Sequence, residues 1–255
     1  MASHFGLGAY PIAYSPTMND TSDQWLFRKE DLLAIPSNTS SQYSSPVGKH
    51  GSPDTHNWRA RGCLFIHNVA RLLGLRQVIA STACVYFHRF YMRQSVTQYQ
   101  QYKWQLLLKS REIAVLENCC FDLDITHPYI YIDKLAMEFG IPVYIANSAT
   151  AHVNDSMRSP LCLLYKPEVV AVAALYFAMS VHKWSFNRYL FNSQAVKLPA
   201  NAQLEVKACI MDILDFYSSE AKAENEAFKL QQQQQQRRRR QQQQQHRQKE
   251  QPRRA

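Results

Sequence analysis

Apolar residues recur every three or four positions along most of the patterned stretches of this chain, which is the period of a helix with one buried face. Of 255 residues, only 7 are glycine and 46% are apolar, which is enough to bury a core in one large domain or two of ordinary size. Residues 169–179 are apolar nearly all round, as in a helix buried on every side. The sequence therefore predicts an all-α protein.

The expected helices form two groups. Asp54 or Thr55 is suited to cap the first long helix, and Gly74 is suited to end it. The second group opens at Pro128, which is suited to the first turn of a helix, and Gly140 is suited to end that helix. In the first of these helices the residues at core-facing spacing are Trp58, Gly62, Phe65, Ile66, Val69, Leu72 and Leu73. The expected helices lie at about residues 25–33, 55–73, 77–92 and 104–120, and then at about 128–139, 144–156, 167–181 and 203–217.

The positive charge is concentrated at the end of the sequence. Residues 231–255 carry eight Lys or Arg and one Glu, so this segment accounts for +7 of the net +9 and leaves about +2 for the rest. Arg237, Arg238, Arg239 and Arg240 lie between two glutamine tracts. Such a composition favours a solvated, disordered low-complexity tail, with a nuclear address or a weak RNA contact as the alternative.

Several function classes lack their sequence signals. The six cysteines form no CxxC pair, and no stretch combines a nucleophile with a base, a set of metal ligands or a glycine-rich phosphate loop. We therefore expect no enzyme, no cofactor and no metal. The longest apolar run is shorter than the roughly 20 residues that a bilayer requires, and no leading segment resembles a signal peptide, so we expect an intracellular, soluble protein with reduced thiols and no membrane partner.

Short motifs along residues 24–218 resemble the cyclins, and within them the cyclin K and cyclin T class with its fungal relatives. The strongest is ACVYFHRFYM at 83–92; the others are WLF at 25–27, CFDL at 120–123, HPY at 127–129, VNDS at 153–156 and YKPE at 165–168. The resemblance implies a tandem pair of cyclin-fold helical repeats. We expect a disordered arm at 1–20, the first repeat at 21–126, the second at 127–220 and the low-complexity tail at 221–255.

The same resemblance implies a function. Cyclins of this class bind and activate cyclin-dependent kinases that phosphorylate the RNA polymerase II C-terminal repeats, which supports transcription elongation in the nucleus. In the family, a Lys on the third helix and a Glu on the fifth helix of the first repeat grip the kinase. Glu112 matches that Glu, and the apolar positions that face the kinase match Leu116, Phe121 and Leu123. From the residues alone, Glu112 could be an ordinary solvated residue, Leu116 and Phe121 ordinary core residues, and the pair His88 and Arg89 hydrogen-bonded packing or surface.

The chain departs from the family after residues 98–102, where it passes directly to the expected fifth helix. The third and fourth helices of the first repeat, about 30 to 40 residues with their loops, are absent, so the first repeat is expected to lack its centre. One alternative function is therefore a truncated cyclin that does not activate the kinase and competes for partners. Another is a cyclin-fold transcription factor that binds nucleic acid, although a charge of about +2 outside the tail disfavours it; we expect nucleic-acid contact at most through the tail.

Overall fold

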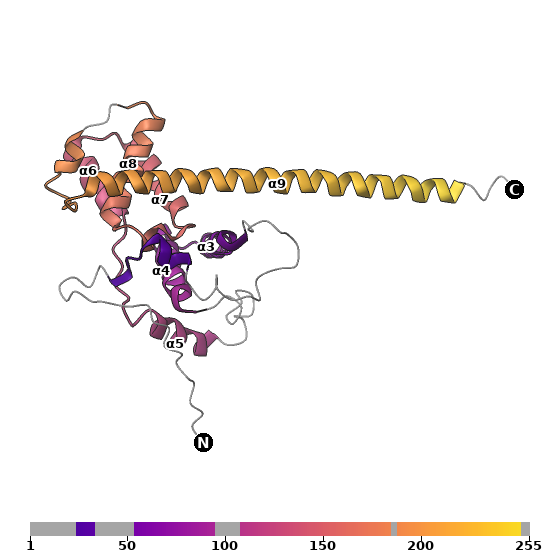
Figure 1. Cartoon of the computed structure of the whole chain (residues 1–255), viewed down its shortest axis with the longest axis horizontal. Helices are drawn as coiled ribbons and strands as arrows, with labels where there is room; N and C mark the ends of the chain where they lie inside the picture. The colour runs from indigo at the N-terminus through magenta and orange to yellow at the C-terminus, as the bar shows by residue number, and fades with distance from the viewer. Residues whose placement is uncertain (1–23, 34–53, 95–107, 185–187, 251–255) are drawn as a thin grey trace, which may run out of the picture. The chain divides into compact units, whose positions relative to one another are not determined.

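The computed structural model describes residues 24–33, 54–94, 108–184 and 188–250 (Figure 1). Every regular element within these ranges is a helix, which confirms the predicted all-α class. The α-helices are α1 (Lys29–Leu33), α3 (Asp54–Leu72), α4 (Gln77–Arg93), α5 (Leu108–Asn118), α6 (Tyr129–Phe139), α7 (Val143–Ser156), α8 (Pro167–Val181) and α9 (Ala202–Glu250), and short 3₁₀ helices span Pro160–Leu163 and Arg188–Asn192.

The chain divides into two compact units. The first contains the described residues up to Ile125 together with Cys162–Lys166, and the second contains Thr126–Leu161 and the residues from Pro167 onward. The segment Cys162–Lys166 joins the first unit, although our expected ranges put it in the second repeat. Leu163 explains this, because its side chain is fully buried in the first unit's core and its carbonyl accepts a 2.7 Å hydrogen bond from the amide of Phe27.

Two predicted helix ends occur at glycines in the left-handed conformation. Gly74, which follows α3, has φ = 64°, and Gly140, which follows α6, has φ = 62°. A residue without Cβ adopts this conformation at little cost, so it closes the last helical turn. The amide of Gly140 donates to the carbonyl of Ala136 as part of this closure.

Aromatic residues from α3 and α4 form the core of the first unit. The cluster contains Trp58, Phe90, Tyr91, Met92 and Leu163. The rings of Trp58 and Tyr91 meet edge to face with centroids 5.0 Å apart, a favourable geometry for aromatic pairs. The Phe87 ring packs beside them and lies so close to Gly62 that a Cβ there would be 2.2 Å from its Cζ atom.

Part of the apolar face expected to be buried on α3 is exposed. Phe65 is 58% exposed, Leu72 82% and Leu73 67%, and Val78 and Ile79 at the start of α4 are exposed as well. Trp58 and Gly62 are buried as predicted. Nothing in the described part of the first unit covers the exposed face, because that part holds α1, α3, α4 and α5 and no counterpart of the buried α8.

Helix α8 is the buried centre of the second unit and lies against α6, α7 and α9. Residues 169–175, Ala178 and Met179 are all buried. This confirms the prediction that this run forms a helix enclosed on every side. Burial of so much apolar surface in one element is a major source of stability for a small helical unit.

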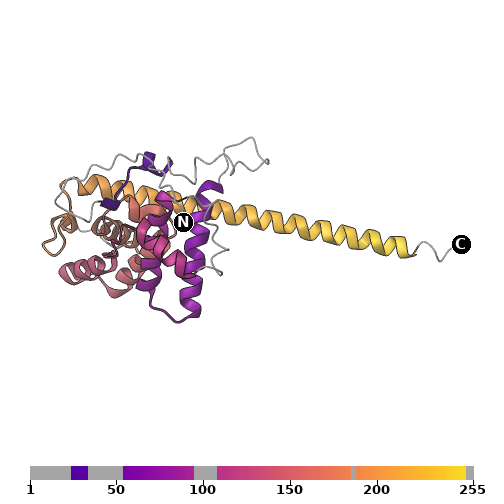
Figure 2. The same cartoon turned by 90° about the horizontal axis from the view of Figure 1, so that it is seen from below.

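Helix α9 continues through most of the expected tail, as one helix in both views (Figures 1 and 2). Where the composition led us to expect disorder after residue 220, the structure has helix to Glu250. Gln, Arg and Lys are good helix formers, and extending a helix that is already packed at Val206, Cys209 and Ile213 needs no new nucleus. Within the described residues, no helix is both long enough and apolar enough to cross a membrane.

Candidate partner-binding surface

The chain turns sharply where α5 ends. Cys120 and Phe121 both have φ = 55°. The amide of Phe121 donates to the carbonyl of Leu116 at 2.9 Å, and the amide of Cys120 donates to the carbonyl of Glu117 at 3.0 Å. This pair of hydrogen bonds is the Schellman arrangement of a helix C-terminus, in which the left-handed position usually holds glycine. Cys120 is strained in this left-handed conformation, and such strain persists only when surrounding contacts hold the turn in place.

The turn presents apolar side chains to solvent. Phe121 is 66% exposed and Leu123 is 47% exposed. Glu112 on α5 is also exposed, whereas Leu116 is partly buried. All four residues predicted to bind a kinase therefore lie on α5 or on the turn after it. The alternative that Phe121 is an ordinary core residue is wrong, because most of its ring surface is open to solvent.

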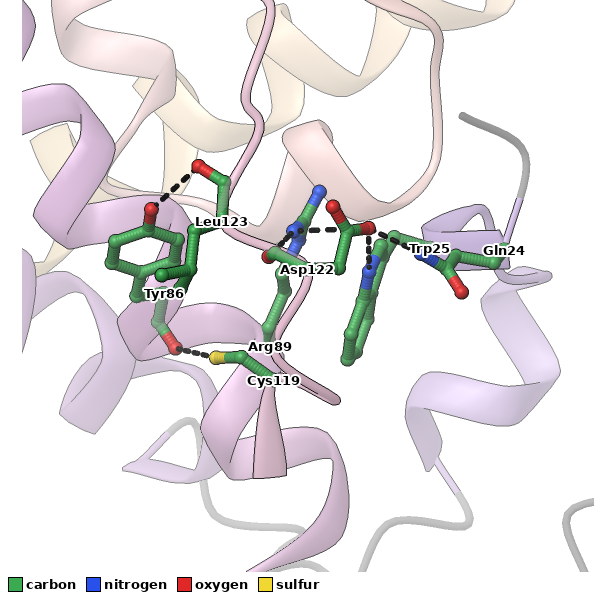
Figure 3. A network of polar contacts seen from close by, with 7 residues as sticks. All are labelled: Gln24, Trp25, Tyr86, Arg89, Cys119, Asp122 and Leu123. Carbon is green, nitrogen blue, oxygen red and sulfur yellow. Dashed lines mark hydrogen bonds and ion pairs between the residues drawn. The ribbon is translucent and has the colours of Figure 1, made fainter. Parts of the chain in front are cut away.

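Asp122 anchors the turn through a polar network that contains Trp25 and Arg89 (Figure 3). Its carboxylate oxygen Oδ2 accepts a 2.8 Å hydrogen bond from Nε1 of Trp25 and another from the side-chain amide of Gln24. The same oxygen lies 3.7 Å from Nη1 of Arg89. Nη1 of Arg89 also donates a 3.0 Å bond to the backbone carbonyl of Asp122. One residue of the turn is thus bonded to α4 and to the segment before α1.

Arg89 is buried where α4 meets the Trp25 ring. It is 8% exposed, and its Cζ atom lies 4.6 Å from the Trp25 ring centroid, within the range of a cation–π contact. Burial lowers the pKa of Arg89, and the charge of Asp122 partly offsets this effect. The sequence indicated that Arg89 belonged to hydrogen-bonded packing or surface, and the structure shows hydrogen-bonded packing. The sequence did not indicate that Trp25, Arg89 and Asp122 contact one another.

A second pair of contacts holds the turn from α4. The hydroxyl of Tyr86 donates a 2.8 Å bond to the carbonyl of Leu123, and the thiol of Cys119 lies 4.0 Å from the carbonyl of Tyr86 (Figure 3). Burial raises the pKa of the Cys119 thiol to about 11, so this thiol is a packing group with little thiolate. Residues 119–123 are therefore held at both ends, and the exposed side chains of Phe121 and Leu123 project from a fixed backbone.

Arg59 joins α3 to α4. Its guanidinium donates to the carbonyls of His88 at 3.3 Å and Tyr91 at 3.1 Å, and Nη1 lies 3.3 Å from Nδ1 of His88. Burial lowers the pKa of Arg59 to about 10. His88 is fully buried, so it and Arg59 stabilise the helix pair and do not face a partner.

The described residues hold few groups of the kinds that bind metals or form disulfides. Within them, no three His, Cys, Asp or Glu side chains lie close enough together to hold a metal ion. All six cysteines are free, and four of them are buried. Exposed apolar side chains on a backbone fixed by hydrogen bonds are typical of a protein-binding surface.

Comparison with known proteins gives the family context. No protein-family model matches the chain. Cyclin pch1 of Schizosaccharomyces pombe is 28% identical over 214 residues, which cover 64% of this chain and 60% of the relative. Cyclin-K of Homo sapiens is 25% identical over 224 residues, covering 70% of this chain and 37% of the relative. The chain thus spans less than two thirds of the length of these curated relatives.

Solved structures give the same fold. A chain of the yeast RNA Pol II CTD kinase CTDK-1 complex superposes with a TM-score of 0.56 at 16% identity, covering 75% of this chain and 72% of the other. A chain of the CAK complex of Chaetomium thermophilum bound to ATP-gamma-S gives a TM-score of 0.52 at 14% identity, covering 75% and 76%. Sequence relatives and fold together confirm that this chain resembles the cyclins, and the cyclin K and cyclin T class fits it.

Proposed function

We propose that this chain is a regulatory cyclin subunit that binds a cyclin-dependent protein kinase through Glu112, Leu116, Phe121 and Leu123. The observation that carries the proposal is that Phe121 and Leu123 are exposed on a turn fixed by Asp122 and Tyr86. A fixed backbone loses little conformational freedom on binding, so more of the apolar contact energy contributes to affinity. The carboxylate of Glu112 then sets the register of docking more than its strength.

We further propose that the bound kinase phosphorylates the C-terminal repeats of RNA polymerase II in the nucleus, and that the complex supports transcription elongation. Support comes from the fold shared with the yeast RNA Pol II CTD kinase CTDK-1 complex and from the cyclin K relatives. In this role the chain catalyses nothing; it stabilises the active form of its partner. The basic end of α9 supplies the nuclear address.

A second candidate, a truncated cyclin that binds the kinase weakly and competes for other partners, is favoured by one observation. The apolar face of α3 around Phe65, Leu72 and Leu73 is exposed, which is expected if the central helix of the first repeat is lost. The lost third helix would also remove the Lys that acts with Glu112 in the family. Losing one of two buried, charged groups at an interface costs about 2 to 5 kcal/mol of binding free energy, or roughly 30-fold to several thousand-fold in affinity. The two candidates therefore differ in kinase affinity.

A pull-down with a kinase of the RNA polymerase II C-terminal repeats tests both. Five proteins are compared. Three are the chain, its Phe121→Ala variant and a Met137→Ala control. The other two are a repaired chain, with a third and fourth helix from a cyclin K inserted between Tyr102 and Lys103, and the Phe121→Ala variant of that repaired chain. Met137 is a matched control because it is 78% exposed and lies in the second unit. Kinase activity is read on a C-terminal-repeat peptide.

We expect Phe121→Ala to weaken kinase binding about tenfold or more, as at an exposed apolar anchor, and Met137→Ala to leave it unchanged. Activation by the original chain supports the first candidate. Binding and activation only by the repaired chain support the second. If Phe121→Ala binds as well as its parent in both the original and the repaired chain, the assigned surface is wrong.

A further inference from the structure

The end of α9 concentrates positive charge on one helix. Six of the eight Lys or Arg residues in 231–255 lie within 231–250, which belongs to α9, with Glu250 as the single acid. Twenty residues of α-helix span about 30 Å. Phosphates along a nucleic-acid strand are spaced by only a few ångströms, so a helix of this length can contact several phosphates at once.

The helix has no apolar residue in this part. Residues 231–250 consist of Gln, Arg, His, Lys and Glu alone. A helix that lies in a membrane interface needs an apolar face, and a purely basic segment needs a second anchor for stable membrane binding. The core of a typical protein interface also needs apolar contacts. Nucleic acid needs neither, because neutralised phosphates release counterions and this release drives binding.

The rest of the chain leaves this charge available. Residues 1–230 carry a net charge of about +2, so they offer no excess of acidic groups to neutralise it. After Glu220, the side chains that the structure describes are all exposed: Ala221, Lys222, Asn225, Lys229, Gln232, Gln234 and Gln235. Arg is well suited to binding nucleic acid, because its planar guanidinium can donate two hydrogen bonds to the oxygens of one phosphate.

We propose that the part of α9 at residues 231–250 binds the phosphate backbone of nucleic acid without sequence preference, with Arg237, Arg238, Arg239 and Arg240 as the main contacts. This binding does not depend on the kinase surface of the first unit. It would hold the protein near RNA or DNA, and phosphate contacts of this kind position a protein without reading base sequence.

The test measures fluorescence anisotropy of a labelled single-stranded RNA of about 20 nucleotides and of duplex DNA, titrated with the full chain at about 50 to 200 mM salt. Two variants are compared. In one, Arg237, Arg238, Arg239 and Arg240 are all replaced by Gln, which removes four charges and keeps helix propensity. In the other, the same four residues are replaced by Lys, which keeps the charge. Circular dichroism confirms equal helix content.

We expect the parent chain to lose about 50-fold more RNA affinity than the Gln variant over this salt range, because four phosphate contacts contribute about −2.8 to the slope of log K against log salt. The Lys variant should keep the parent slope. Equal slopes for the parent and the Gln variant would overturn the proposal. So would tighter binding to phosphatidylserine vesicles than to RNA, which would assign the segment to membranes. We expect these four substitutions to leave the kinase pull-down unchanged, because the proposed kinase surface lies on α5 and the turn after it. Failure of one proposal is therefore distinguishable from failure of the other.

Discussion

The indole Nε1 of Trp25 donates a 2.8 Å hydrogen bond to the carboxylate of Asp122, across 97 positions of the sequence. This contact joins the segment before α1 to the turn after α5, and Arg89 of α4 packs against both residues. The turn that carries Phe121 and Leu123 therefore depends on two other parts of the first unit, the segment before α1 and helix α4.

Replacing Trp25 by Phe should destabilise the first unit. The substitution removes the hydrogen bond to Asp122, worth about 1 kcal/mol, and part of the ring surface beneath Arg89. We expect a loss of about 1 to 3 kcal/mol in the free energy of unfolding, measured by urea denaturation, and weaker kinase binding because the turn is less well held. Met137→Ala, at an exposed site, should change neither quantity. An unchanged unfolding midpoint in Trp25→Phe would show that the network contributes no stability.

Gly62→Ala should force α3 and α4 apart. The new Cβ would lie 2.2 Å from Cζ of Phe87, and that ring is also packed against Trp58 and Tyr91. Overpacking of this kind costs about 1 to 3 kcal/mol. The smaller side chain in the double variant Gly62→Ala, Phe87→Leu should recover part of the loss. Thermal unfolding of the parent, both single variants and the double variant gives the coupling between the two sites, and an additive result would contradict the close approach.

Substituting Leu72→Gln and Leu73→Gln together should improve solubility at little cost in stability. Both residues are more than 60% exposed, and exposed apolar patches promote association. We expect less self-association in size-exclusion chromatography with multi-angle light scattering, and a melting temperature close to that of the parent. A large drop in melting temperature would instead mean that this face is covered in solution.

The second unit should resist proteolysis. Its helices pack around the buried α8, so residues 127–218 should survive limited trypsin digestion as a fragment. Cleavage is expected at exposed sites after residue 220, such as Lys222 and Lys229. Mass spectrometry identifies the products, and early cleavage within 127–218 would refute the expectation of an independently stable repeat.

Acid should weaken the second unit through His152. Desolvation lowers the pKa of His152 below its ordinary value of 6.5, and its Nδ1 is 2.9 Å from the hydroxyl of Tyr217. Below about pH 6.5 the unfolded chain binds a proton that the folded chain does not, so stability is full above this pH and decreases as pH falls toward the lowered pKa. Desolvation lowers the pKa of His127 as well.

The measurement is the melting temperature at several values between about pH 7.5 and pH 5. We expect the parent to lose stability over this range and His152→Gln to lose less, because Gln has no proton to gain. If the two proteins show the same pH dependence, His152 does not contribute to it.

The periodicity of the sequence was enough to predict most helices. Gly74 and Gly140 end α3 and α6 in the left-handed conformation, and most of the apolar run of α8 is buried, because local propensity, end signals and burial all favour the same structure there. The family motifs also placed Glu112, Leu116, Phe121 and Leu123 on one segment of the chain.

Tertiary structure alone decided two features of the first unit. One is the exposure of Phe65, Leu72 and Leu73, and the other is the contact of Trp25 and Arg89 with Asp122. Periodicity states which residues prefer burial, but only a covering helix buries them, and the described first unit has none over this face. Likewise, no local rule relates residue 25 to residue 122. Contacts at such a separation form only once the chain has folded, because the entropy lost in closing the intervening loop must be repaid by packing that no local pattern encodes.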